Sequence, residues 1–370
     1  MGRMHSLARI LAVPTRPTMY VSSLHDPYVH LAWEDFLFRT VAPDVPVCFL
    51  YVNTPCVVIG KNQNLWGEVD PRAMRAAHIP VVRRKSGGGS VYHDLGNLNY
   101  SFHMPRSAFS RRTHTELVAR ALHAPPVSLP SRFGRPPVFL NARYDLAVYS
   151  LGAPTADAAH ERKVSGSAYK VAQDRAYHHG TLLLHADLAR MSMLKQRRHN
   201  MESKAVASVP SPVANLQETF PGAPCTLAHV TEAIRAEFVR MYGSTDVHTL
   251  DASCLDAAAH VRGKHVRVRS SYEDMQTWSW LYGTSPAFSV TASTQAVPDG
   301  DRQGTLTLHC TYGRVDRVDV RSAAGGFAEA AQTLVGAPYD ALVLPPPSVV
   351  PRSSWPLEAR MAAWLERALC

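Results

Sequence analysis

The chain has 370 residues, 46% of them hydrophobic, enough for one large domain or for a large and a small one. Its net charge of +9 comes from small basic groups along the whole sequence, with no single basic stripe of interleaved aromatics, so we expect no nucleic-acid partner. No apolar run reaches the roughly 18 residues of a membrane-spanning helix. The six scattered cysteines lack zinc-type spacing and are interpreted as reduced thiols.

The N-terminal segment has the composition of an organellar transit peptide. Several arginines and hydroxyl residues precede the first acidic residue, Asp26, and a short amphipathic pattern ends at Pro14 and Pro17. This composition predicts a mitochondrial targeting tail over residues 1–18 and a mitochondrial location. An untidy tail on a cytoplasmic protein is the alternative.

Hydrophobic spacing and turn residues predict the elements that follow. In chain order we expect a helix at 30–39, strands at 47–52 and 56–59, a short helix at 71–77, strands at 80–84 and 98–103, helices at 187–194 and 227–242, a strand-rich region at 287–322, and helical patterns at 327–334 and 357–369. In the first helix, Glu34 and Asp35 are expected to face away from the core. Two stretches, 124–138 and 151–160, are predicted as surface insertions.

A glycine-rich stretch, VVRRKSGGGSVYHDLGNLNYSF, runs from Val81 to Phe102. It fits neither a Walker loop nor a dinucleotide-binding fingerprint, and its position between strands argues against a linker. Three glycines permit positive φ and let backbone N–H groups approach a ligand, while Arg84 adds a planar guanidinium, so we predict an oxyanion or phosphate site. A β-bulge with surface arginines is the alternative. His93 and Asp94 either contact the ligand or cap a tight turn.

A second cationic stretch, ERKVSGSAYKVAQDRAYHHGTLL, contains Lys163 just before a bend of small residues at 165–167. A solvated surface lysine is the alternative to a functional one. His178 and His179 would point to opposite faces of a strand, which argues against one shared metal. No nucleophile elbow and no catalytic Cys/His pair is recognisable. Two cationic loops suit the joining of a carboxylate to the α-phosphate of ATP, whose charge these groups and Mg²⁺ would neutralise.

These stretches, together with LYVNTPCVVIGKNQNLWGEV and TWSWLYGTSPAF, resemble blocks of the lipoate-protein ligase A family, in the family's order, over roughly residues 20–325. The resemblance implies an α+β fold. A mixed β-sheet catalytic domain of the biotin/lipoate protein ligase type would span residues 19–250, and a smaller α+β C-terminal accessory domain would span 251–370.

The resemblance also implies a two-step reaction. Lipoate reacts with ATP to give lipoyl-AMP and pyrophosphate, and the acyl group then moves to a lysine of an apo lipoyl domain. Octanoate is expected as a second acyl substrate that can replace lipoate. The expected acceptors are subunits of 2-oxoacid dehydrogenases and the glycine-cleavage H protein. ATP and Mg²⁺ are the expected cofactors, with no metal site from protein spacing alone, and we expect a monomer.

The same resemblance assigns site residues by position. Lys163 matches the family's central lysine, which contacts both the acyl carboxylate and the adenylate phosphate. The remaining expected nucleotide contacts are Arg84, Gly87, Gly88, Gly89, Ser90, Val91, Tyr92 and Asp145. The remaining expected lipoyl contacts are Ser86, His93, His179 and Asn62.

Three departures from the family pattern keep other functions open. Arg143-Tyr144-Asp145 lacks the family's asparagine, Lys170 stands where arginine is common, and the stretch SVPSPVANL at 208–216 has prolines where a basic residue is usual. A lipoyltransferase or octanoyltransferase that uses preformed lipoyl-AMP or another acyl carrier is therefore the alternative. A noncatalytic module that binds lipoyl domains is a more remote one.

Overall fold

The structure, a computed structural model, describes residues 13–194, 200–294, 304–321 and 325–343 of the chain. Most of the predicted targeting tail and the predicted helix at 357–369 lie outside these residues. None of the helices in the described part combines the length and the apolar character that crossing a membrane requires.

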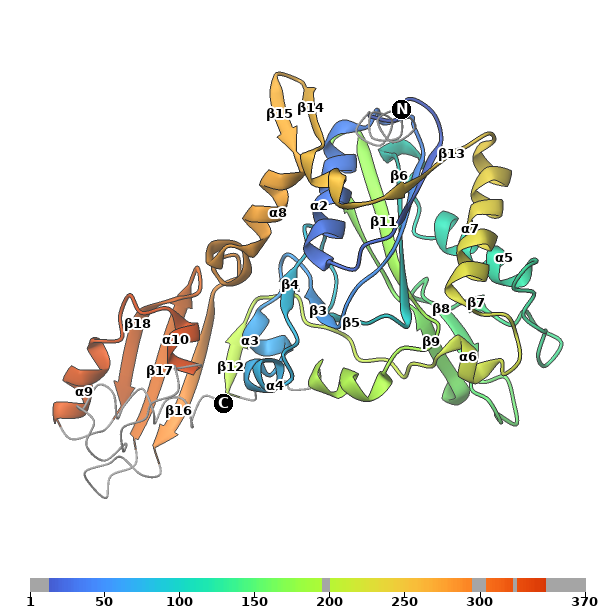
Figure 1. Ribbon diagram of the computed structural model, residues 1–370. Coiled ribbons are helices and arrows are strands. Elements are labelled where there is room, and N and C mark those ends of the chain that lie inside the picture. Colours follow the sequence, from blue (N-terminus) through green and yellow to red (C-terminus); the bar gives the residue numbers. More distant parts are fainter. Residues whose placement is uncertain (1–12, 195–199, 295–303, 322–324, 344–370) are drawn as a thin grey trace.

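A six-stranded mixed sheet forms the centre of the larger part of the molecule (Figure 1). β1 pairs in parallel with both of its neighbours, and the other pairings are antiparallel. In spatial order the strands are β10 (Ser167–Val171), β11 (Arg175–Leu183), β6 (Asn97–Pro105), β2 (Val47–Val52), β1 (Thr18–Ser22) and β13 (Asp246–Leu250).

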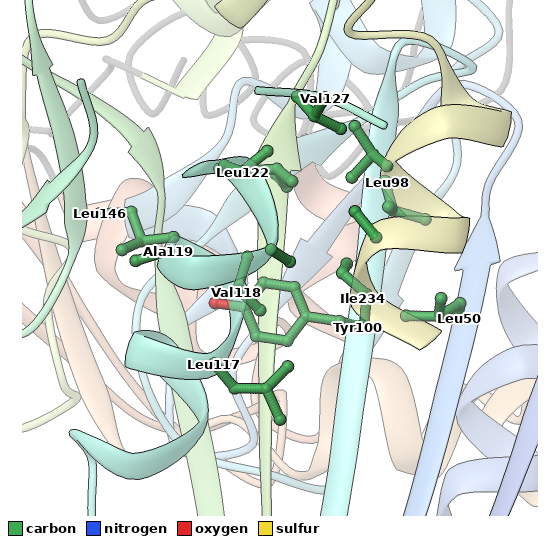
Figure 2. Packing of buried hydrophobic residues seen from close by; sticks show 14 of the residues in the cluster. Leu50, Leu98, Tyr100, Leu117, Val118, Ala119, Leu122, Val127, Leu146 and Ile234 are labelled. Atoms are coloured by element: carbon green, nitrogen blue, oxygen red, sulfur yellow. The ribbon is translucent and has the colours of Figure 1, made fainter. Parts of the chain in front are cut away.

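Helices cover both faces of this sheet because successive strand residues point to opposite sides. In β2, Val47 and Phe49 pack with α2 (Pro27–Thr40). Cys48 and Leu50 pack instead with α5 (Thr113–His123) and α7 (Leu227–Tyr242). Figure 2 shows this second layer, in which Leu50 and Tyr100 of the sheet meet Val118 and Ile234 of the two helices.

Two of these helices allow the predicted bounds to be compared with the observed ones. α7 has the predicted bounds, because Thr226 caps its first turn and Gly243, at φ 83°, ends it. α2 begins earlier than predicted, because Asp26 accepts from two N–H groups of the first turn and Pro27 is already shaped for a helix. Glu34 and Asp35, expected to face away from the core, are 1% and 5% exposed, so that expectation was wrong for both.

Two three-stranded sheets lie beside the central one. The first has the order β4 (Val81–Arg83), β3 (Cys56–Ile59) and β5 (Val91–His93), and the second the order β7 (Phe139–Leu140), β8 (Leu146–Tyr149) and β9 (Glu161–Ser165). β4 and β5 both pair with β3, so the glycine-rich stretch between them is a loop that crosses the end of β3, as predicted. The short helices α3 (Leu65–Glu68), α4 (Pro71–Ala76) and α6 (Leu216–Thr219) lie in connections.

The C-terminal part contains a four-stranded antiparallel sheet with the order β12 (Met201–Ser203), β16 (Phe288–Thr294), β17 (Gly304–Thr311) and β18 (Arg314–Arg321). It is accompanied by α9 (Gly325–Gln332) and α10 (Tyr339–Val343). The hairpin of β14 (Ala258–Val261) and β15 (Lys264–Arg267) and the helix α8 (Val268–Gln276) pack on α2. β12 comes from within the predicted catalytic range, and the division at residue 250 stays a prediction.

The two predicted insertions differ in the structure. Residues 151–160 are mostly exposed. In the other insertion Val127, Leu129 and Val138 are buried in the core beneath α5, so the expectation of a surface segment was wrong for these side chains. The predicted α+β class with a large mixed sheet is confirmed.

Candidate functional site

A cavity of about 360 Å³ lies where the glycine loop, the β9–β10 bend, β11 and the segment 206–209 meet. Eight of the predicted site residues line it: Arg84, Gly89, Ser90, Val91, His93, Asp145, Lys163 and His179. The structure therefore brings together two stretches that lie about 75 residues apart in the sequence.

The other predicted site residues lie outside the cavity wall. Ser86 is buried directly behind it, and Gly87 and Gly88 form the outer part of the loop. Tyr92 is 1% exposed and packs in the hydrophobic core around Trp66. Asn62 is exposed, and its carbonyl accepts from the N–H of Val206 at 3.2 Å. Their assignments to nucleotide or lipoyl contacts stay predictions.

Arg84 holds the glycine loop in shape. Its side chain is 4% exposed and donates to the carbonyl oxygens of Gly87 at 2.6 Å and Gly89 at 2.8 Å, and to the Ser86 hydroxyl at 2.9 Å. Burial lowers the pKa of its guanidinium to about 10, which leaves it charged at neutral pH. The N–H groups of Gly87, Gly88 and Gly89 have no partner among the described residues.

The loop also depends on a close backbone approach. A Cβ at Gly60 would lie 2.1 Å from the carbonyl oxygen of Gly88, and Gly88 itself has φ 88°. No other residue type fits the first position without moving the loop. The alternative of a bulge with surface arginines is wrong, since Arg83 and Arg84 are both buried.

Lys163 projects from β9 over the β9–β10 bend into the cavity. Its ammonium lies 3.1 Å from the Asp145 carboxylate, and Arg143 Nη2 lies 3.2 Å from the same oxygen, Asp145 Oδ2. The side chain of Lys163 is 26% exposed, so an incoming anion can reach it. The ammonium packs over Gly166, where a Cβ would lie only 2.5 Å from Lys163 Nζ. Asp145 thus holds two cations at the edge of the cavity.

Hydrogen bonds to buried groups on both sides fix the orientation of the His179 ring. Its Nδ1 lies 3.0 Å from a carboxylate oxygen of Glu34, and its Nε2 lies 2.8 Å from the Ser86 hydroxyl. Tyr51 donates to the same carboxylate at 3.1 Å. The ring therefore connects Glu34 to the hydroxyl that Arg84 also contacts. His178 points to the other face, as predicted, and does not line the cavity.

His93 has one ring nitrogen without a hydrogen-bond partner in the described part of the chain. Its Nδ1 lies 2.9 Å from the Asn53 amide nitrogen, and the Asn53 oxygen lies 2.6 Å from His30 Nδ1. Burial lowers the pKa of His93 to about 3 and that of His30 to about 4, so both rings are neutral. With Nδ1 accepting from Asn53, the Nε2 of His93 carries the proton and is free to donate to a ligand. Asp94 caps the turn instead, accepting from Gly96 N at 2.8 Å.

The segment 206–209 closes one side of the cavity. The Ser208 hydroxyl accepts from Ser90 N at 2.8 Å and from the Gln63 amide at 3.0 Å, and it donates to the buried carboxylate of Glu68. Just beyond, Lys163 N donates to Pro212 O at 2.9 Å, which ties this segment to β9. None of the described side chains that this segment contributes to the wall is basic. Lys170 pairs with Asp35 and does not line the cavity.

Arg83 connects the site to the C-terminal part. It is fully buried and donates to Leu281 O at 2.7 Å, to the Ser285 hydroxyl at 2.9 Å and to Gln63 O at 2.7 Å. In the other direction, the Trp280 indole donates to Arg83 O at 2.8 Å. The strand that leads into the glycine loop is therefore bonded to the segment before β16.

Sequence reasoning missed several of these residues: Glu34, Asn53, Glu68, Arg83 and Ser208. Each is a polar residue with a hydrogen-bond partner that is distant in the chain, so no local sequence pattern predicts its role. A signal for Arg83 was present in the sequence, because an arginine at the end of an otherwise apolar strand needs a partner if it is buried.

The chemistry of the cavity is that of a cationic site with apolar walls. Arg84, Arg143 and Lys163 supply positive charge, while Leu31 and Val58 supply apolar surface. No group of three or more His, Cys, Asp or Glu able to hold a metal occurs in the described residues. Asp145, the one carboxylate among the described lining residues, is already paired with two cations.

Comparison with solved structures identifies proteins of the same fold. Three solved structures share the fold at low sequence identity. LipL1 of P. falciparum in complex with lipoate has a TM-score of 0.57 and 20% identity, covering 95% of this chain and 99% of that one. A lipoate-protein ligase A bound with ATP has a TM-score of 0.50 and 21% identity, with 72% and 98% coverage. A bipartite lipoate protein ligase of T. acidophilum, described with its E2 lipoyl domain, has a TM-score of 0.50 and 19% identity, with 72% and 96% coverage.

The family model of the lipoyl protein ligase A/B catalytic domain matches residues 26–239, which is more than half of the chain. This range contains the glycine loop, Lys163, His179 and the segment 206–209, so it includes all the described residues that line the cavity. The chain therefore belongs to the lipoyl protein ligase A/B catalytic-domain family.

Proposed function

We propose that the protein is a lipoate-protein ligase, which activates lipoate with ATP to lipoyl-AMP and transfers the lipoyl group to a lysine of a lipoyl domain. The observation that carries the proposal is the position of Lys163, whose ammonium lies over Gly166 at the edge of a cavity that the glycine loop also lines. The structural neighbours described with lipoate and with ATP support the two substrates.

In the first step a carboxylate oxygen of lipoate attacks the α-phosphorus of ATP and pyrophosphate leaves. Both reactants are anionic, so their approach requires positive charge that is already in place. Lys163 would contact the carboxylate and the α-phosphate, and the free N–H groups of the glycine loop would contact phosphate oxygens. Mg²⁺ would enter with the triphosphate, because the described lining residues include no unpaired carboxylate to hold it.

In the second step the amine of the acceptor lysine attacks the carbonyl carbon of lipoyl-AMP and AMP leaves. Lys163 would stabilise the negative charge that develops on the carbonyl oxygen and on the leaving phosphate. The apolar wall at Leu31, Val58 and Val91 would hold the acyl chain, and the Nε2–H of His93 would donate a hydrogen bond to the acyl group.

One observation favours a second candidate, a lipoyltransferase or octanoyltransferase that takes preformed lipoyl-AMP or another acyl carrier. The segment 206–209 contributes no described basic side chain to the cavity, and prolines follow at 210 and 212. A nucleotide triphosphate carries more charge than an adenylate and needs more cations to hold it. The acyl-binding part of the cavity is the same in both candidates.

Pyrophosphate release and acylation of an apo lipoyl domain separate the candidates. The ligase releases pyrophosphate with lipoate and ATP and acylates the domain. A transferase acylates only from lipoyl-AMP or an acyl carrier. Acylation from no donor would contradict both and favour a noncatalytic binding module. Octanoate in place of lipoate measures the acyl preference in the same assay.

We propose as acceptors the lipoyl domains of 2-oxoacid dehydrogenase complexes and the glycine-cleavage H protein; the T. acidophilum neighbour described with its E2 lipoyl domain supports the first of these. A mitochondrial location is proposed from residues 1–18, and residues 1–12 lie outside the described part of the chain. Detection of the unprocessed chain only in the cytosol would contradict the targeting proposal.

A further inference from the structure

A second cavity, of about 510 Å³, shares no lining residue with the first. It lies at the C-terminal end of α2, between the β10–β11 turn and the β14–β15 hairpin. Four cations line it, Arg39, Arg175, Arg262 and Lys264, against one carboxylate among its described lining residues, Asp174. This composition favours an anionic occupant.

Arg175 sets this cavity apart from an ordinary basic surface. Its side chain is buried, with the residue 5% exposed, and none of its three guanidinium nitrogens has a hydrogen-bond partner among the described residues. The equally buried Arg83 and Arg84 make six and five hydrogen bonds. A buried charge without a partner is costly, so proteins rarely keep one without a use.

The neighbouring carboxylates do not satisfy Arg175. Asp174 and Asp44 act on it only through Coulomb attraction, and the Asp174 carboxylate accepts a hydrogen bond from Arg262 instead. Burial lowers the pKa of Arg175 to about 10, so the guanidinium still carries its charge at neutral pH. Burial and the nearby charge of Arg175 lower the pKa of the buried His103 ring, which is therefore neutral and adds no second positive charge beside Arg175.

We propose that this cavity is a binding site for a small oxyanion, a molecule with a carboxylate or a phosphate group. The planar guanidinium of Arg175 would bind two of its oxygens, and Arg262 and Lys264 on the hairpin would close over it. The nitrogens of Arg175 lie just beneath the cavity wall, so binding requires a rotation of its outer side-chain torsions. The site is independent of the proposed lipoyl transfer.

The signal of the Arg175 Nε–H group in an ¹H–¹⁵N spectrum of the ¹⁵N-arginine-labelled protein tests the site directly. Its assignment comes from its loss in Arg175→Met. Sodium phosphate and sodium acetate are titrated separately at constant ionic strength with sodium chloride. A saturable shift with phosphate, with acetate or with both supports the site and identifies the anion class. Shifts that fail to saturate with either anion, as expected for the exposed Arg235, would overturn it.

Thermal unfolding provides a second measurement that does not depend on one buried variant. The anion that saturates the signal should raise the Tm of the wild-type protein and of the control Arg235→Met, which alters an exposed arginine paired with Glu232 on α7. In Lys264→Gln, on the exposed hairpin, half-saturation should require about tenfold more anion. An equal response in Lys264→Gln and in Arg235→Met would contradict the proposed rim contact.

Discussion

The replacement Gly166→Ala separates catalysis from folding. The new Cβ would lie 2.5 Å from both Cε and Nζ of Lys163, where ordinary contacts are 3.4–4 Å, so the ammonium must retreat by about 1 Å. Apart from atoms of the two residues next to it in the chain, the nearest described heavy atom after these is Asp145 Oδ1 at 3.9 Å. The substitution therefore moves the central lysine while its charge and the rest of the cavity remain.

Gly166→Ala should change the reaction rate much more than the free energy of unfolding. A misplacement of about 1 Å at a reacting group costs on the order of 10²-fold in rate, which is about 2.7 kcal/mol of activation free energy. The free energy of unfolding should change by less than about 1 kcal/mol, because the flexible end of a lysine yields easily and alanine restricts the unfolded chain more than glycine does.

Lipoyl transfer to an apo lipoyl domain measures the first property and urea unfolding the second. Gly67→Ala is the matched control, since the atom nearest to its new Cβ is Met201 Sδ at 3.6 Å, an ordinary contact, and Gly67 does not line the cavity. We expect the control to retain nearly full activity. A Gly166→Ala protein with unchanged transfer, or one whose loss of activity follows an equal loss of stability, would refute the reasoning.

Three further predictions follow from buried groups. Arg83→Met removes six hydrogen bonds, including those to Leu281 O, and should lower the free energy of unfolding in urea by about 3 kcal/mol or more; a change below 1 kcal/mol would contradict this role. Ser208→Ala removes the acceptor for Ser90 N and should raise the KM for ATP severalfold in pyrophosphate release; an unchanged KM would argue against closure by this segment. His30 and His93 have pKa values of about 4 and 3, below those of the unfolded chain, so the unfolded state takes up protons first on acidification. Stability should therefore fall between about pH 6.5 and pH 4, as measured by urea unfolding at several pH values, and a flat profile would contradict it.

The sequence predicted those elements whose ends carry their own signals. α7 follows from a capping threonine and a terminal glycine, and the glycine loop follows from its position between strands. β12 was not predicted, because three residues at 201–203 show no periodicity and pair with a strand that begins 85 residues later, at Phe288. Val127 was misjudged because a proline-rich segment can still bury single apolar side chains.

The sequence predicted the two stretches that line the cavity, but it did not predict how they meet. Charged residues beside small ones mark Lys163 and the glycine loop locally, whereas their meeting depends on the pairing of sheets distant in the chain. Glu34 shows the limit of periodicity. The spacing of apolar residues places Glu34 on the polar side of its helix, which predicts exposure to solvent. In the structure that side faces His179 and Tyr51. A buried hydrogen-bond network of this kind can be recognised only when the positions of the strands are known.

Lipoylation of an apo lipoyl domain by the wild-type protein and by Lys163→Ala, followed by intact-mass spectrometry, tests the central claim most directly. With lipoate and ATP, the wild type should add one lipoyl group and release pyrophosphate, and the variant should be slower by about 10²-fold or more. Near-normal transfer by Lys163→Ala would contradict the role assigned to this lysine, and no acylation by the wild type from any donor would contradict the proposed function.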